Sequence, residues 1–153
     1  MVATHYDMGS EKFSSGLTRD FLKTLTWKQI IDVKGIRLAM IAKDLERYDL
    51  RPEIRLNPEV FKKFRPKERG IDIGMADVFD NPLTTEWRTV RPEVAIRLNH
   101  DMREDVNLGG PGMVPVVMDD GTGGKMVIPQ ATQGFPGLIE FRMPCEVPPK
   151  EGE

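Results

Sequence analysis

Proline and glycine are distributed very unevenly along this chain of 153 residues. Residues 1–49 contain three glycines and no proline, whereas residues 50–153 contain eleven glycines and all twelve prolines. Proline lacks a backbone N–H, and glycine loses more conformational entropy on folding than any other residue. The first third of the chain can therefore form helices, while the remainder is expected to form short elements joined by irregular backbone.

Composition is consistent with one ordered domain that has a modest hydrophobic core. Hydrophobic residues make up 39% of the chain and charged residues 30%. We expect an α+β fold in which N-terminal helices precede a small antiparallel β unit with long irregular Pro/Gly-rich connections. The expected divisions are an N-terminal tail (1–16), a helical region (17–64), a β-rich irregular region (65–147) and a C-terminal tail (148–153).

The N-terminal third carries the clearest helix signals. Thr26 and Gln29 have the T-x-x-Q spacing of a capping box, and Thr18 is placed to cap a short helix before it. Apolar residues at helical spacing predict a further helix that ends before Arg51-Pro52, because the residue before proline avoids the α region. Gly35 is expected to divide this segment into two helices.

Two side-chain patterns decorate these predicted helices. Phe21, Leu22 and Leu25 are expected to share one apolar face. Asp44 and Arg47 are expected to form an ordinary solvent-exposed pair on the opposite side of the longer helix.

Sequence signals after residue 50 predict further helix starts and several strands. The pairs Asn57-Pro58 and Asn81-Pro82 each predict a helix start, with proline at the first helical position. Strands are expected over residues 94–98 and 138–143. Residues 114–118 and 125–128 flank a glycine-rich turn and predict a hairpin.

One short sequence appears twice. Arg51-Pro-Glu-Ile-Arg-Leu-Asn57 returns as Arg91-Pro-Glu-Val-Ala-Ile-Arg-Leu-Asn99, with two inserted residues. Both copies are expected to be short strands entered through Arg-Pro. The repeat indicates either a duplicated unit or a coincidence, and one pair of short matches does not distinguish them.

Known catalytic and cofactor motifs are not evident in the sequence. The single cysteine, Cys145, cannot form an internal disulfide, and the two histidines, His5 and His100, give no zinc-ligand spacing. Glycine-rich stretches at 109–112 and 121–125 lack the pattern of a phosphate-binding loop and are interpreted as turns. We therefore expect neither a catalytic residue nor a cofactor, and an enzyme is the less favoured reading.

Charge distribution supports two kinds of partner. Residues 1–70 carry a net charge of +5 and residues 71–153 a net charge of −7, an asymmetry that can steer association. The strongest basic run interleaves cations with Phe64, which is a pattern that can hold nucleic acid. Its candidate contacts are Lys62, Lys63, Arg65, Lys67 and Arg69.

These features lead to three hypotheses about function. The first is a non-catalytic structural subunit that docks onto a larger assembly, such as a virion shell or a multisubunit complex, as a homo- or hetero-oligomer. The second is an accessory subunit of an enzyme whose catalysis lies on another chain, and the third is a nucleic-acid-binding module using residues 62–69. Large aromatic and methionine side chains would anchor the protein partners: Trp27, Trp87, Phe135, Met113 and Met118.

The expected location follows from segments that the sequence lacks. It shows neither a secretory signal pattern at its N-terminus nor an apolar run of about 18 residues that would span a membrane. We expect a soluble intracellular protein or one assembled into a particle.

Overall fold

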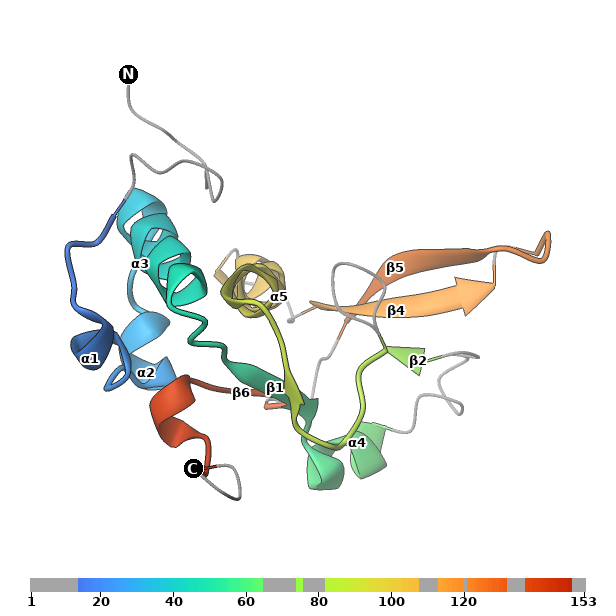
Figure 1. Ribbon diagram of the computed structural model, residues 1–153. Helices are drawn as coiled ribbons and strands as arrows, with labels where there is room; N and C mark the ends of the chain where they lie inside the picture. The colour runs from blue at the N-terminus through green and yellow to red at the C-terminus, as the bar shows by residue number, and fades with distance from the viewer. Residues whose placement is uncertain are drawn as a thin grey trace. The chain divides into compact units, whose positions relative to one another are not determined.

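The computed structural model describes residues 14–64, 74–75, 82–107, 113–119, 121–131 and 137–149. These residues form helices and two three-stranded sheets, so the predicted α+β class is confirmed (Figure 1). The chain divides into two compact units that are described separately. Unit 1 contains Met1–Ile54, Thr89–Ala95 and Phe141–Glu153, and unit 2 contains Arg55–Arg88 and Ile96–Glu140.

Unit 1 begins with helices whose caps match the predictions. The Thr18 side chain accepts a hydrogen bond from Phe21 N at 3.1 Å. Thr26 and Gln29 form the predicted capping box, with Gln29 Oε1 accepting from Thr26 N at 2.9 Å. The helices are α1 (Arg19–Leu22), α2 (Trp27–Ile30) and α3 (Gly35–Arg47).

Gly35 separates α2 from α3, as the sequence predicts. It is the first residue of α3 and has a φ of +65°, a conformation that side-chain-bearing residues rarely adopt. One face of α3 is buried in unit 1, and its apolar members are Leu38, Ala39, Ile41, Ala42 and Leu45. The helix ends at Arg47, before Arg51-Pro52, as expected.

The first sheet has the strand order β3-β1-β6. Its strands are β1 (Glu53–Leu56), β3 (Arg88–Thr89) and β6 (Ile139–Arg142). Along β1, Ile54 and Leu56 are buried while Glu53 and Arg55 are half-buried, which is the alternation of a strand with one covered face. The strand predicted over 138–143 is confirmed as β6, which is followed by the 3-10 helix η2 (Pro144–Glu146).

In unit 2, α4 (Pro58–Phe64) begins at the predicted Asn-Pro signal. Asn57 Oδ1 accepts hydrogen bonds from Glu59 N at 3.0 Å and from Val60 N at 3.3 Å. The asparagine therefore satisfies free amides of the first helical turn, and Pro58 occupies the position where a missing N–H costs nothing.

The second sheet is antiparallel, has the order β2-β4-β5 and belongs to unit 2. Its strands are β2 (Gly74–Met75), β4 (Met113–Asp119) and β5 (Lys125–Ala131). The predicted hairpin is confirmed, and Figure 1 shows β4 and β5 side by side. Its register places Asp119 opposite Lys125 and Pro115 opposite Pro129. Neither proline can donate, so this pair occupies a position without hydrogen bonds between the two strands.

The strand predicted over residues 94–98 is wrong, because these residues lie in helix α5 (Pro92–Asn107). Pro92 is the first helical residue, and the Arg91 carbonyl accepts from Val94 N at 2.9 Å and from Ala95 N at 3.3 Å. An Arg-Pro pair can thus open a helix as readily as a strand. The two copies of the repeated sequence consequently have different structures and are not copies of one structural unit.

The helix start predicted at Asn81-Pro82 is also wrong. Asn81 lies outside the described residues, and residues 82–87 contain no helix. These residues instead run beside the end of β1, where Leu56 N donates to Thr84 O at 2.7 Å. Backbone pairing with β1 has therefore formed in place of the helix that the Asn-Pro signal predicts.

Within the part of the chain that the structure describes, no helix combines the length and apolar character needed to cross a membrane.

Candidate functional site

Trp27, one of the predicted partner anchors, joins α2 to β6 within unit 1. Its indole stacks on the Phe141 ring with 4.7 Å between centroids and an interplanar angle of 7°. Glu146 Oε2 reinforces the junction by accepting from Trp27 N at 3.2 Å and from Met143 N at 2.7 Å. Trp27 is half-buried, so it serves an internal contact while keeping part of its surface accessible.

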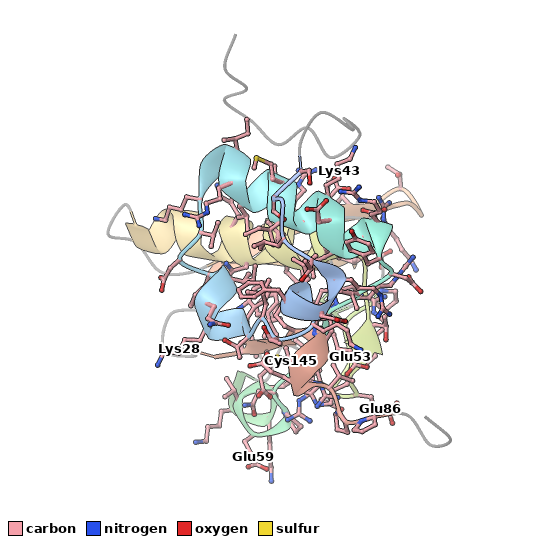
Figure 2. All side chains as sticks on the ribbon, turned by 60° about the vertical axis from the view of Figure 1, so that its left-hand side comes forward. Lys28, Lys43, Glu53, Glu59, Glu86 and Cys145 are labelled. Carbon is pink, nitrogen blue, oxygen red and sulfur yellow. The ribbon has the colours of Figure 1, made fainter. Side chains whose placement is uncertain are left out.

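Cys145 lies beside this junction and is exposed (Figure 2). Its Sγ donates to Leu25 O at 2.7 Å. Partial burial of the thiol, followed by the nearby Glu146 carboxylate, raises the pKa of Cys145. A raised pKa leaves less thiolate at neutral pH, which disfavours a nucleophilic role for this cysteine.

Trp87, a second predicted anchor, contributes a corresponding internal contact in unit 2. The Arg55 guanidinium lies 4.6 Å from the centre of the Trp87 ring, within cation–π range. Arg55 Nε also donates to Glu140 Oε1 at 3.0 Å. Arg55 thereby ties β6 and the segment before β3 to β1, and Trp87 remains half-buried.

In unit 1, Glu53 connects β1 to both neighbouring strands. Arg142 donates to Glu53 Oε1 from Nε at 2.9 Å and from Nη2 at 2.6 Å, and Thr89 Oγ1 donates to Oε2 at 3.4 Å. Both side chains of the ion pair are largely buried. The geometry of this carboxylate is accounted for by cross-strand hydrogen bonding.

Asp44 differs most from its expected position. Instead of facing solvent, it is 1% exposed and lies in the core of unit 1. Burial raises the pKa of Asp44, but hydrogen bonds from Ser15 and Arg47, with the positive charge of Arg47, outweigh that effect and lower the pKa below its usual value. Asp44 is therefore a charged, fully bonded carboxylate at neutral pH. Sequence spacing showed only Arg47, because Ser15 lies 29 residues away.

Among the described residues, the large apolar side chains left exposed are Phe21 at 49%, Ile36 at 36% and Met126 at 45%. Phe21 was expected to share a buried face with Leu22 and Leu25. Leu22 and Leu25 are buried, but Phe21 is exposed. Adjacent residues of a helix differ by about 100° in direction, which separates Phe21 from Leu22, and Leu25 lies beyond the end of α1, where helical spacing no longer applies. Because α1 is only one turn long, the sequence contains no apolar repeat in a second turn that would indicate which face is buried.

The remaining predicted residues fall into separate regions. Met113 and Met118 lie in β4, opposite Ala131 and Met126 of β5. Lys62 and Lys63 are exposed in the last turn of α4. The other predicted contacts lie outside the described residues: Phe135, Arg65, Lys67 and Arg69.

No arrangement of three or more histidine, cysteine or acidic side chains suited to a metal ion occurs in the described ranges. The carboxylates of Glu53, Glu140 and Glu146 instead accept hydrogen bonds from residues of their own unit. Comparison of the chain with protein-family models, with curated proteins and with solved structures finds no match.

Proposed function

We propose that this chain is a non-catalytic interaction subunit that binds other protein subunits in a larger assembly, such as a multisubunit complex or a virion shell. The observation that carries the proposal is Phe21, an aromatic side chain that is 49% exposed on α1 although its neighbour Leu22 is fully buried.

The use of charged groups supports this proposal. Glu53, Glu140 and Glu146 accept hydrogen bonds from residues of their own unit. Hydrogen bonds of this kind hold the strands and helices of one unit together. Polar chemistry in the described residues thus favours a structural role.

The exposed apolar side chains support protein rather than small-molecule recognition. Aromatic residues and methionine are enriched in the cores of protein interfaces, where Phe21 and Met126 would be suitable anchors. Covering the exposed half of a phenylalanine contributes about 1–2 kcal/mol to association. Trp27 of unit 1 and Trp87 of unit 2 are half-buried, and each would add its accessible edge to an interface formed by its own unit.

Affinity purification from the native source tests the proposal with a matched pair of variants. Phe21→Ser removes the exposed aromatic, and Lys23→Ser changes an exposed residue two positions later. We expect wild type and Lys23→Ser to retain one recurring partner in fixed stoichiometry, measured by native mass spectrometry, and Phe21→Ser to lose it.

The identity of the partner then distinguishes two versions of the proposal. Shell proteins would indicate a structural component, whereas a catalytic polypeptide whose activity depends on this chain would indicate an accessory enzyme subunit. A stable monomer that shows turnover alone and retains no partner would overturn both versions.

A second candidate function is nucleic-acid binding, which is favoured by the adjacent exposed side chains of Lys62 and Lys63. If both lysines bind phosphates, replacing them with alanine should reduce the number of counterions released on binding by about two, and binding should depend less steeply on salt. Fluorescence anisotropy with single-stranded oligonucleotides at several salt concentrations measures this. Equal binding by wild type and the double alanine variant would eliminate the candidate.

A further inference from the structure

Residues 14–17, called the strap below, are attached to α3 through one buried carboxylate. Asp44 Oδ2 accepts hydrogen bonds from Ser14 Oγ at 3.2 Å, Ser15 N at 2.8 Å and Ser15 Oγ at 2.6 Å. Arg47 pairs with Asp44 Oδ1 and also donates from Nη2 to Ser14 Oγ at 3.4 Å. The strap is therefore held on the helix by a single negative charge that has little access to water.

The Ser15 hydroxyl has two functions in this attachment. It donates to Asp44 and accepts from Leu17 N at 3.3 Å, while Ser14 Oγ accepts from Gly16 N at 3.2 Å. These local bonds fold the strap into the turn that presents both hydroxyls to Asp44. Loss of the Ser15 hydroxyl would remove both the shortest of the strap's bonds to Asp44 and one bond that shapes the strap.

We propose that Ser15 is a modification site whose phosphorylation releases the strap from α3. A phosphate ester at Ser15 lacks the donated hydrogen and brings about −1.5 to −2 charges against a buried carboxylate. The Asp44 carboxylate is shielded from water while the strap stays in place, so its repulsion of the phosphate is poorly screened and favours detachment. The inference concerns the isolated chain and is independent of the proposed function.

The reaction is an ordinary phosphoryl transfer from a nucleoside triphosphate, catalysed by a protein kinase. A bond forms between Ser15 Oγ and the γ-phosphorus, the bond from that phosphorus to the diphosphate leaving group breaks, and the hydroxyl proton passes to the kinase's base. Ser15 is half-buried between exposed Ser14 and Gly16, in a segment that is neither helix nor strand.

Ser14 provides a control because its Oγ also donates to Asp44 Oδ2, at 3.2 Å, but has the Arg47 guanidinium beside it as well. Its Oγ lies within 3.4 Å of Arg47 Nη2, so a phosphate on Ser14 can pair with the guanidinium. Phosphorylation at Ser14 is therefore expected to perturb the strap less than phosphorylation at Ser15.

Hydrogen exchange measured by mass spectrometry on the full chain tests the release. Chains carrying phosphoserine at position 15 are expected to exchange the amides of residues 15–17 at least tenfold faster than wild type, since hydrogen bonds to a charged group protect by about that factor. Phosphoserine at position 14 is expected to accelerate exchange by less than about threefold.

The Asp44→Asn background separates charge repulsion from simple loss of a hydrogen bond. Because the repelling charge is absent there, phosphoserine at position 15 is expected to add no more acceleration than Ser15→Ala does. An equal effect of phosphorylation in both backgrounds, or unchanged exchange in the Asp44 chain, would overturn the proposal.

Accessibility is tested by supplying a broad-specificity serine kinase with radiolabelled ATP. Labelling of Ser15 in the folded chain supports the site. The contrary result is labelling of a synthetic peptide covering residues 10–20 without labelling of the folded chain. It would show that the fold makes the Ser15 hydroxyl inaccessible to the kinase, and would likewise overturn the proposal.

Discussion

Residues 51–57 and 91–99 both begin with Arg-Pro-Glu and end with Arg-Leu-Asn, yet the first forms strand β1 and the second opens helix α5. Burial reflects the difference. In β1 buried and half-buried residues alternate, whereas Val94, Ala95 and Ile96 are buried in succession. Three consecutive buried residues conflict with a strand that has one covered face, but suit a helix with a wide buried face.

The sequence that follows each segment explains why they diverge. Pro58 comes directly after Asn57 and limits the first segment to four strand residues before α4 begins. No proline follows the second segment until Pro111, so α5 can continue for 16 residues. The distance to the next proline thus has more influence on the secondary structure of the two segments than their identical residues do.

Introducing that proline should produce the largest effect. His100→Pro recreates the Asn-Pro pair after the second segment and places a proline ring against the carbonyl of residue 96. We expect the free energy of unfolding to fall by about 3 kcal/mol or more and helix content to fall with it. Urea unfolding and far-UV circular dichroism measure both quantities.

His100→Ala is the control for loss of the imidazole and should keep the helix content of wild type. Unchanged helix content in His100→Pro would show that chain length before the next proline does not decide the structure of this segment.

The glutamates at equivalent positions should differ next. Glu53→Ala removes the bonds from Arg142 and Thr89 between strands, and should cost about 2 kcal/mol because a largely buried arginine loses its partner. Glu93→Ala removes only a 3.5 Å pairing with exposed Arg91 and should cost about 0.5 kcal/mol or less. Chemical denaturation compares the two, and equal costs would contradict the different roles assigned here.

The equivalent leucines sharpen the comparison through side-chain shape. Leu56 and Leu98 are both buried, so replacement by valine removes one methylene from each at a cost of about 1 kcal/mol. Valine also restricts side-chain rotation in a helix, so Leu98→Val should cost about 0.5 kcal/mol more than Leu56→Val. Thermal unfolding of both variants gives the difference, and a reversed order would be inconsistent with helix and strand.

The smallest effect is expected for Pro58→Ala. Asn57 still caps α4 in this variant, so the free energy of unfolding should fall by only about 0.5 kcal/mol, through greater freedom of the unfolded chain. Asn57→Ala should cost about 1 kcal/mol, because it removes the cap itself. If the proline variant were the less stable of the two, Pro58 rather than Asn57 would be what starts α4.

Features that depend on neighbouring residues could be predicted from the sequence. The Thr26–Gln29 capping box, the Asn57 cap and the β4–β5 hairpin each satisfy nearby backbone groups and appear as expected. Their energetics are local, so a short stretch of sequence contains the necessary information.

Features that depend on distant residues could not be predicted. Asp44 reads as a surface partner of Arg47 until Ser14 and Ser15 cover it from about 30 residues away. The segment after Pro82 likewise pairs with β1 instead of forming a helix. For the candidate site, the role of Trp27 and Trp87 as partner anchors stays a prediction, and the sequence shows no sign that Phe21 would be exposed while Leu22 is buried.

The pairing of Pro115 with Pro129 has a consequence for how the hairpin meets other chains. Since the two prolines occupy a position without hydrogen bonds, the nitrogen of Pro129 faces away from β4, toward the outer side of β5. A foreign strand aligned there would find a gap in the row of amide donors between Val127 and Ala131. The missing donor makes the outer edge of β5 a poorer template for the addition of a further strand.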